Sequence, residues 1–139
     1  MTEFVSDVKI IPYADSDIFR VLSDLRNLEL VKGMIPEDKI KDFIFDKDSV
    51  TFTVDSIGKV TFVVEDREPD KLVKFKSVRL PFEIMMELHL SQITEKDTEF
   101  SMKVISNLNP FMKGMVEKPM KEAVERISEA LAKLPYDRI

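Results

Sequence analysis

The residues best suited to acid/base or metal chemistry gather on one predicted strand. Glu83, Glu87 and His89 share one face of it, and two carboxylates near an imidazole can move protons or bind a metal ion. Residues two apart on a strand, however, are separated by about 6.6–6.8 Å. The same strand also carries an apolar series on its other face. We therefore expect these three side chains to lie in solvent rather than in a site.

Composition excludes most other catalytic chemistry. The 139 residues include no cysteine and one histidine, so neither a thiolate nucleophile nor a multi-histidine metal site can be built. The three glycines, Gly33, Gly58 and Gly114, form neither a P-loop nor a dinucleotide fingerprint. A Ser/His/Asp triad would need His89, and no serine stands in a nucleophile-elbow context. We expect no metal and no resident cofactor.

Length and charge limit the class of protein. The chain is long enough for one domain, covering residues 1–139, and no linker or repeat divides it. It carries 21 basic and 26 acidic residues, a net charge of −5, which disfavours nucleic acid as a partner. The acidic start, Met1–Asp7, is unlike a signal peptide, and no apolar run reaches membrane-spanning length. We expect a cytoplasmic protein without membrane insertion, and the sequence carries no signal of its oligomeric state.

The first 35 residues predict one strand and two helices. Phe4–Ile11 alternates and is rich in Val and Ile, as strands are. A helix follows, capped by Asp15 or Ser16 and ending near Asn27. Leu28–Met34 indicates a second short helix. The first helix has an apolar stripe at helical spacing, formed by Ile18, Phe19, Val21, Leu22 and Leu25.

The middle of the chain has a period of two. Five turn signals separate six predicted strands, and the connections are short enough for an antiparallel meander. One face of each of the last strands is apolar and the other polar. The predicted strands are Ile40–Phe45, Val50–Val54, Lys59–Glu65, Leu72–Val78, Phe82–Gln92 and Thr98–Ile105.

A long amphipathic helix ends the chain. Asn109 and Pro110 supply an N-cap and a first-turn proline, and the helical pattern covers Phe111–Leu134. Pro119 lacks an N–H group, so a bend is expected there. The wide apolar face needs a sheet to pack against.

This order of elements resembles the START/Bet v 1-like (SRPBCC) superfamily, which includes polyketide cyclases and dehydrases. The resemblance covers Phe4 through Leu134 and rests on Ile11–Asp15 leading into Ile18–Asp24, and on Glu65–Val73. It implies an α+β helix-grip fold, with a curved antiparallel seven-stranded sheet around the C-terminal helix and two short helices after strand one. It also implies a cavity between sheet and helix, with its mouth near the N-terminal half of that helix.

Flexible or large apolar side chains could line such a cavity from both walls, and methionine adapts to irregular ligands. They could equally fill an ordinary core. An empty void of roughly 300 Å³ would cost about 7 kcal/mol, so a large dry cavity is not expected. The candidate ligand contacts are Met34, Phe62, Phe75, Met86, Phe100, Met102, Met112 and Met115. Candidate polar groups are Ser6, Asp7, Tyr13, Asp42, Ser77, Asn107 and Asn109.

Three functions fit these features. The leading hypothesis is a protein that binds a small apolar ligand, lipid-like or polycyclic, with no assigned reaction. The second is a polyketide cyclase- or dehydratase-like enzyme that uses a pocket carboxylate or Tyr13 as acid/base. The third is a protein-interaction module with a filled core and an exposed apolar patch.

Overall fold

The computed structural model describes residues 2–30, 40–54, 58–80 and 83–139. Within these residues the strands form one antiparallel sheet in the order β1-β8-β7-β6-β5-β4-β3, with β2 also paired to β8. The strands are β1 (Thr2–Val5), β2 (Lys9–Ile11), β3 (Ile40–Phe45), β4 (Ser49–Val54), β5 (Gly58–Glu68), β6 (Leu72–Val78), β7 (Ile84–Thr94) and β8 (Asp97–Ser106).

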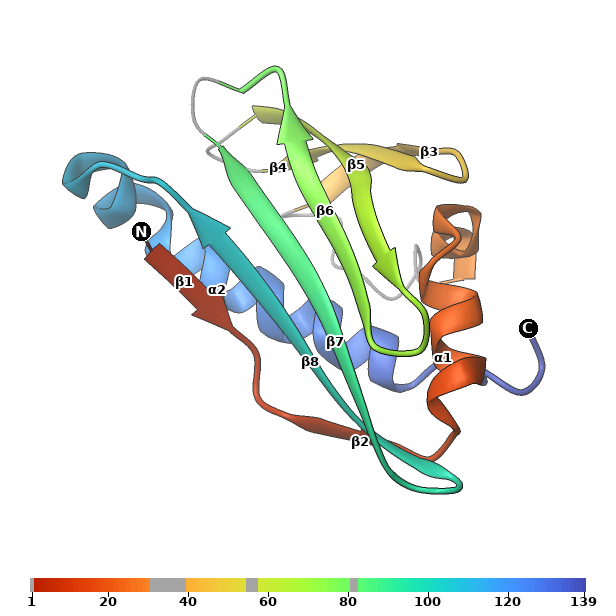
Figure 1. The fold of residues 1–139 in the computed structure, drawn as a ribbon. Coiled ribbons are helices and arrows are strands. Elements are labelled where there is room, and N and C mark those ends of the chain that lie inside the picture. Colours follow the sequence, from red (N-terminus) through yellow and green to blue (C-terminus); the bar gives the residue numbers. More distant parts are fainter. Residues whose placement is uncertain (1, 31–39, 55–57, 81–82) are drawn as a thin grey trace.

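The long helix α2 (Pro110–Ala132) crosses one face of this sheet, and α1 (Asp15–Leu22) lies at one end of it (Figure 1). The core lies between sheet and α2. The largest fully buried side chains include Phe75 on β6, Phe100 on β8 and Tyr136 after α2. The predicted α+β helix-grip architecture is confirmed.

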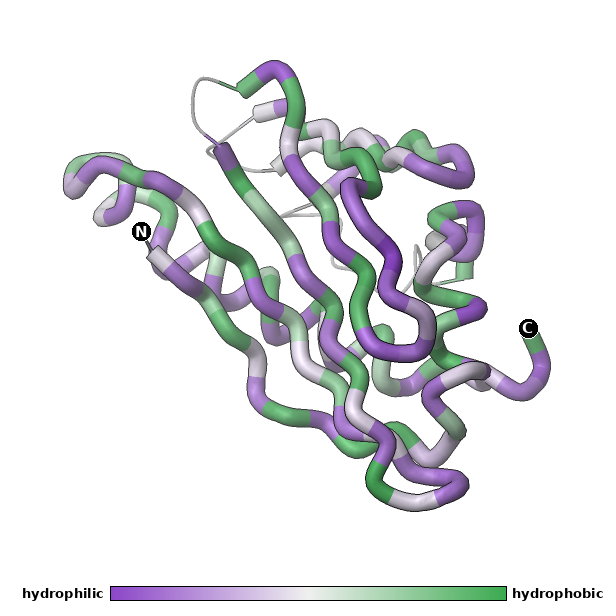
Figure 2. The backbone as a smooth tube through the Cα atoms, in the orientation of Figure 1, coloured by the Kyte–Doolittle hydropathy of each residue, from purple (hydrophilic) through white to green (hydrophobic). Residues whose placement is uncertain are grey.

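The predicted meander is also confirmed. Alternation places Leu88 and Leu90 of β7 in the core, and Glu87 and His89 on the opposite face. Apolar and polar residues accordingly alternate along the strands in Figure 2. The predicted bounds of β3 and β6 match the structure, whereas β5 runs three residues further, to Glu68.

The first predicted strand, Phe4–Ile11, is divided, so the sheet of the described residues has eight strands rather than seven. Ser6 causes the division, because its Oγ accepts from the backbone N–H of Met102 at 2.9 Å, where a strand would offer its carbonyl. The next N–H, that of Asp7, turns to Glu125 on α2 at 2.6 Å. The chain therefore leaves β8 for a few residues before β2 pairs with it again.

The first helix is shorter than predicted. α1 ends at Leu22, and a 3₁₀ helix, η1 (Leu25–Leu30), follows it. Neither Asp15 nor Ser16 caps α1, because Ala14 occupies the N-cap position without a side-chain cap. Instead the backbone N–H of Asp15 donates to the side-chain oxygen of Gln92 on β7 at 3.0 Å. The second helix, predicted for Leu28–Met34, lies mostly outside the described residues.

The predicted cap of α2 is confirmed. Asn109 Oδ1 accepts from the backbone N–H of Met112 at 2.8 Å, and Pro110 opens the helix. Pro119 lies inside α2, and the bend expected there stays a prediction. In the part of the chain that the structure describes, no helix is long and apolar enough to cross a membrane.

Candidate functional site

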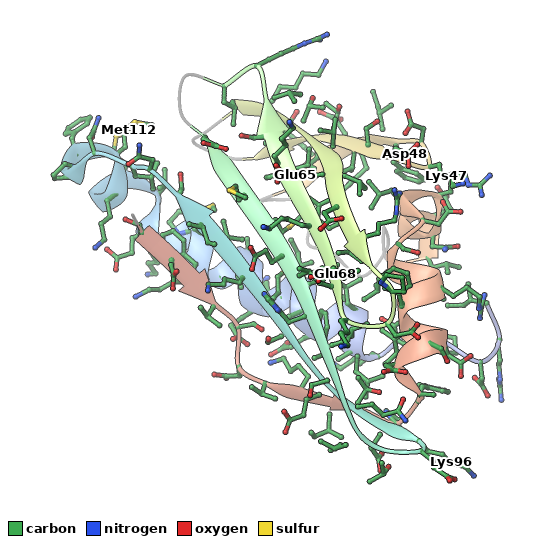
Figure 3. The ribbon with its side chains drawn as sticks, viewed as in Figure 1. Lys47, Asp48, Glu65, Glu68, Lys96 and Met112 are labelled. Carbon is green, nitrogen blue, oxygen red and sulfur yellow. The ribbon has the colours of Figure 1, made fainter. Side chains whose placement is uncertain are left out.

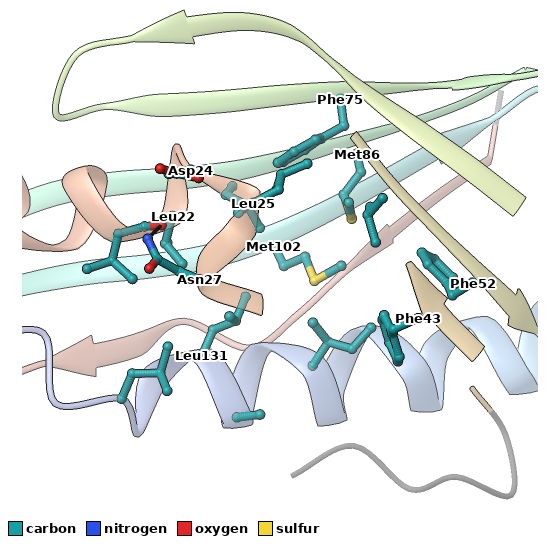
Figure 4. Close-up of a pocket in the computed structure, with 16 residues that line it drawn as sticks. Leu22, Asp24, Leu25, Asn27, Phe43, Phe52, Phe75, Met86, Met102 and Leu131 are labelled. Carbon is teal, nitrogen blue, oxygen red and sulfur yellow. Dashed lines mark hydrogen bonds between the residues drawn. The ribbon is translucent and has the colours of Figure 1, made fainter. Parts of the chain in front are cut away.

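A cavity of about 80 Å³ lies between the sheet, α2 and the segment formed by α1 and η1 (Figure 4). We call it the η1 cavity. Nearly all of its lining residues are apolar. They come from the sheet, from α1 and η1, and from α2. The apolar lining residues are Val21, Leu22, Leu25, Phe43, Val50, Phe52, Phe75, Met86, Leu88, Met102, Ile127, Ala130, Leu131 and Leu134, and the polar ones are Asp24 and Asn27.

A second cavity of about 60 Å³, the β5 cavity, adjoins the first. The two share four lining residues: Phe52, Met86, Met102 and Ile127. Its other lining residues are Val60, Phe62, Ile84, Val104, Met120, Ala123 and Val124, so the described lining is wholly apolar. Side chains of Met86 and Met102 therefore stand between two small empty spaces.

Four of the eight candidate ligand contacts line these cavities. Phe75 lines the η1 cavity and Phe62 the β5 cavity, while Met86 and Met102 line both. Phe100 is fully buried but lines neither.

Of the remaining three candidates, Met112 and Met115 do not join them. Met115 is 53% exposed, and Met112 lies near the start of α2, at the end of the helix beyond the sheet (Figure 3). Neither residue lines either cavity. Met34 is outside the described residues. That these residues contact a ligand stays a prediction.

The mouth that the resemblance implied near the N-terminal half of α2 stays a prediction. The residues of α2 that line the two cavities run from Met120 to Leu131. A signal for this position exists in the sequence. Ala123 and Ala130 are small residues in the apolar stripe of α2, and both line cavities because they leave room below the large side chains of the sheet.

The polar groups of the η1 cavity are already occupied. The carboxylate of Asp24 accepts from Arg26 Nε at 3.0 Å and from Arg26 Nη2 at 2.6 Å. These hydrogen bonds hold the pKa of Asp24 below its ordinary value. The Asn27 amide donates to the carbonyl of Val21 at 2.9 Å. Asp24 is therefore a stable anion in an ion pair, the opposite of a raised-pKa proton donor.

Comparison with solved structures adds to this geometry. Norcoclaurine synthase from Thalictrum flavum, in complex with dopamine and hydroxybenzaldehyde, is 14% identical and superposes with a TM-score of 0.70 over 99% of this chain and 89% of that one. A START superfamily protein from Mycobacterium smegmatis is 13% identical, with a TM-score of 0.69 over 94% of each chain. A protein from Thermus thermophilus is 17% identical, with a TM-score of 0.67 over 95% of each.

The chain has the START/Bet v 1-like helix-grip fold. No family model matches the sequence, and no curated protein matches it either. At these identities the likeness establishes the fold, and function has to be argued from the cavities.

On this helix-grip fold, Glu87 and His89 lie on the sheet face opposite α2, as predicted, whereas Glu83 is exposed and precedes β7, which begins at Ile84. Glu87 and His89 nevertheless contact each other, with 2.7 Å between Glu87 Oε1 and His89 Nε2, although the backbone spacing had suggested separation. Lys74 Nζ lies 3.8 Å from the same carboxylate. No described group of acidic and histidine residues could hold a metal ion. The side chain of Glu87 is only 13% exposed, so the expectation that it lies in solvent is wrong, and its carboxylate is engaged by Lys74 and His89.

The other polar candidates lie outside both cavities. Ser6 is buried, but its hydroxyl accepts a hydrogen bond from the backbone of β8. The ring of Tyr13 meets that of Tyr136 edge-on at 5.9 Å, and burial, together with Asp137, raises its pKa. Asp42 is exposed at a bulge with φ of 60°. Asp7, Asn107 and Asn109 are exposed, and the hydroxyl of Ser77 accepts from the Ile84 N–H at 2.9 Å.

Exposed apolar side chains occur away from the cavities. Phe111 is 77% exposed and lies one helical turn before Met115 on α2. Val5, Val8 and Ile10 are more than half exposed along the N-terminal strands. The hypothesis of a protein-interaction module therefore stays a prediction.

Proposed function

We propose that this protein binds a small apolar molecule in the η1 and β5 cavities. The observation that carries the proposal is a pair of adjoining apolar spaces whose shared walls include Met86 and Met102. Voids cost about 24 cal/mol per Å³, so the two together cost roughly 3 kcal/mol when empty. A ligand that fills them recovers part of this free energy.

Cavity size favours a compact ligand. An apolar cavity of about 150 Å³ in another protein stays dry and binds benzene. Cavities of about 80 and about 60 Å³ come close to this capacity if the methionines between them move. A single aromatic ring or a short hydrocarbon fits better than the lipid-like or polycyclic ligand expected from the sequence. The norcoclaurine synthase complex holds dopamine and hydroxybenzaldehyde, which are single-ring compounds, on the same fold.

Toluene is a suitable probe. We expect it to raise the melting temperature of the wild-type protein in a saturable way, since a ligand at 100 times its Kd adds about 2.7 kcal/mol of stability. Isothermal titration calorimetry gives the Kd directly. No shift and no heat of binding would contradict the proposal.

Two variants locate the site. Ala130→Leu adds bulk to the wall of the η1 cavity, and we expect it to abolish toluene binding while circular dichroism shows a folded protein. Met115→Ala changes an exposed residue of the same helix outside both cavities and should leave the Kd unchanged. If M115A loses binding and A130L retains it, the site lies elsewhere.

A further inference from the structure

The described walls of both cavities carry no positive charge. Among the described residues no lysine, arginine or histidine lines either one, and the β5 cavity has no polar residue at all. Among the lining residues that the structure describes, the one ionisable residue is Asp24, an anion. A carboxylate brought into this space would therefore find no cation among these residues.

Arg26, the arginine closest to Asp24 in the sequence, is already paired with the Asp24 carboxylate. Arg26 donates to the Asp24 carboxylate through Nε and Nη2, and its backbone N–H donates to the same group at 3.1 Å. Asp24 has 21% of its side chain exposed and Arg26 has 66%, so the pair stands at the rim. A ligand carboxylate would have to displace Asp24 from Arg26, which exchanges one ion pair for another and leaves Asp24 without its partner.

Two other arginines contact the α1–η1 region and are engaged as well. Arg67 Nε donates to the carbonyl of Ser23 at 2.9 Å, and its Nη2 donates to Asp48 at 2.7 Å. Arg20 Nη2 donates to the carbonyl of Tyr136 at 3.1 Å. Neither side chain lines a cavity. All three arginines near the site are thus engaged by other groups of the protein.

We propose that the cavities select uncharged ligands and exclude carboxylates, so that free fatty acids and aromatic acids are not ligands of this site. This inference rests on the proposed function. Its physical basis is desolvation, because an ionised carboxylate moved into an apolar space without a partner loses its hydration and gains nothing in return.

Nitrobenzene and benzoate test the charge alone, since they have nearly the same shape and differ in charge. At pH 7, where benzoate is ionised, we expect nitrobenzene to bind as toluene does and benzoate to bind on the order of 100-fold more weakly. Equal Kd values for nitrobenzene and benzoate would overturn the inference while toluene binding still supported the proposed function. If toluene fails to bind, the proposed function itself is wrong.

A gain-of-function variant provides an independent test. Asn27 is half-buried and lines the η1 cavity, so Asn27→Arg would place a cation at its wall. Asn27→Met is the matched control, because it also loses the hydrogen bond to Val21 and adds length without charge. We expect the ratio of the benzoate Kd to the toluene Kd to be roughly tenfold smaller in N27R than in N27M, which corrects for the effect of either side chain on toluene binding. If both variants bind toluene and N27R shows no gain for benzoate, charge is not what excludes it, and the inference fails.

Discussion

Tyr136 packs the segment that follows α2 against the core. It is fully buried, its hydroxyl donates to the carbonyl of Leu131, and its own carbonyl accepts from Arg20. Its ring also meets that of Tyr13. Burial raises the pKa of Tyr136 well above its ordinary value of 10.0, so the folded protein holds a neutral phenol.

Tyr136→Phe removes this one hydroxyl. At pH 7 we expect a loss of about 1 kcal/mol in the free energy of unfolding, since a buried hydrogen bond is lost and the Leu131 carbonyl loses a partner. The unfolded tyrosine ionises near pH 10 and the folded one only at higher pH, so wild-type stability falls as pH rises through this interval. Urea unfolding at pH 7 and pH 10.5 should show a smaller difference between the two proteins at pH 10.5. A constant difference would contradict this account.

Glu125 connects α2 to the break between β1 and β2. Its carboxylate accepts from the Asp7 N–H at 2.6 Å and from Lys9 Nζ at 2.9 Å. The hydrogen bond from Asp7, then that from Lys9, hold the pKa of Glu125 below its ordinary value of 4.5. The bond to Glu125 also raises the pKa of Lys9.

Glu125→Gln removes the charge and keeps an acceptor. The side chain of Glu125 is 35% exposed, so solvent screening limits the loss to about 0.5 kcal/mol. A lowered carboxyl pKa stabilises the fold above the unfolded pKa and ceases to do so as pH falls through the folded one. The stability difference between wild type and E125Q should therefore be constant from pH 6 to 9 and vanish in acid. Chemical unfolding at pH 7 and pH 3.5 measures it, and a difference that grows in acid would refute it.

For a single residue, the sequence predicts which face of a strand its side chain occupies more readily than whether that side chain lines a cavity. The same alternation places Phe100 and Met102 inward on β8, yet only Met102 lines a cavity. What decides is the part of α2 that lies opposite each residue, where Ala123 and Ala130 leave space. Such pairing across layers depends on tertiary packing, which periodicity does not contain.

At the scale of elements, the strands and α2 follow from local pattern because alternation and capping are written in adjacent residues. The split of the first strand and the start of α1 do not. The hydroxyl of Ser6 accepts a hydrogen bond from the Met102 N–H, and the N–H of Asp15 donates to the side chain of Gln92. In both pairs the partners are more than 70 residues apart. Partners this distant in sequence override the local preference for a continuous strand or a side-chain cap.

Arg67 joins three elements around the η1 cavity. From β5 it reaches the carbonyl of Ser23 after α1 and the carboxylate of Asp48 between β3 and β4. Nearby, the Leu25 N–H donates to the Lys47 carbonyl at 3.1 Å, and the Val64 N–H to that of Asp48 at 2.9 Å. Arg67 thus holds η1 against the β3–β4 hairpin. These two elements form two walls of the η1 cavity.

Arg67→Met keeps the aliphatic stem and removes the guanidinium. We expect a loss of about 1–2 kcal/mol in stability and faster amide hydrogen exchange at Leu25 and Val64, because the walls separate more often. Lys76→Met on β6, an exposed residue, is the control and should alter neither rate. Unchanged exchange at Leu25 in R67M would show that Arg67 does not hold η1.

At the scale of the whole molecule, the two cavities adjoin between the sheet and the part of α2 that begins at Met120. Met102 is 2% exposed and borders both spaces. Its side chain, together with those of Phe52, Met86 and Ile127, therefore separates the two cavities. The upper size of a ligand should depend on this residue more than on any residue at the surface.

Met102→Ala should join the cavities. We expect it to cost about 2–5 kcal/mol, as truncation of a buried methionine does, and to admit naphthalene, which the wild-type cavities are too small to hold. Met112→Ala is the matched control, since Met112 lines neither cavity. Calorimetric titration should therefore detect naphthalene binding to M102A but not to M112A or the wild type, and naphthalene should raise the melting temperature of M102A alone. Equal naphthalene binding by all three proteins would mean that the ligand enters elsewhere, and no binding to a folded M102A would mean that the enlarged space closes around the missing side chain.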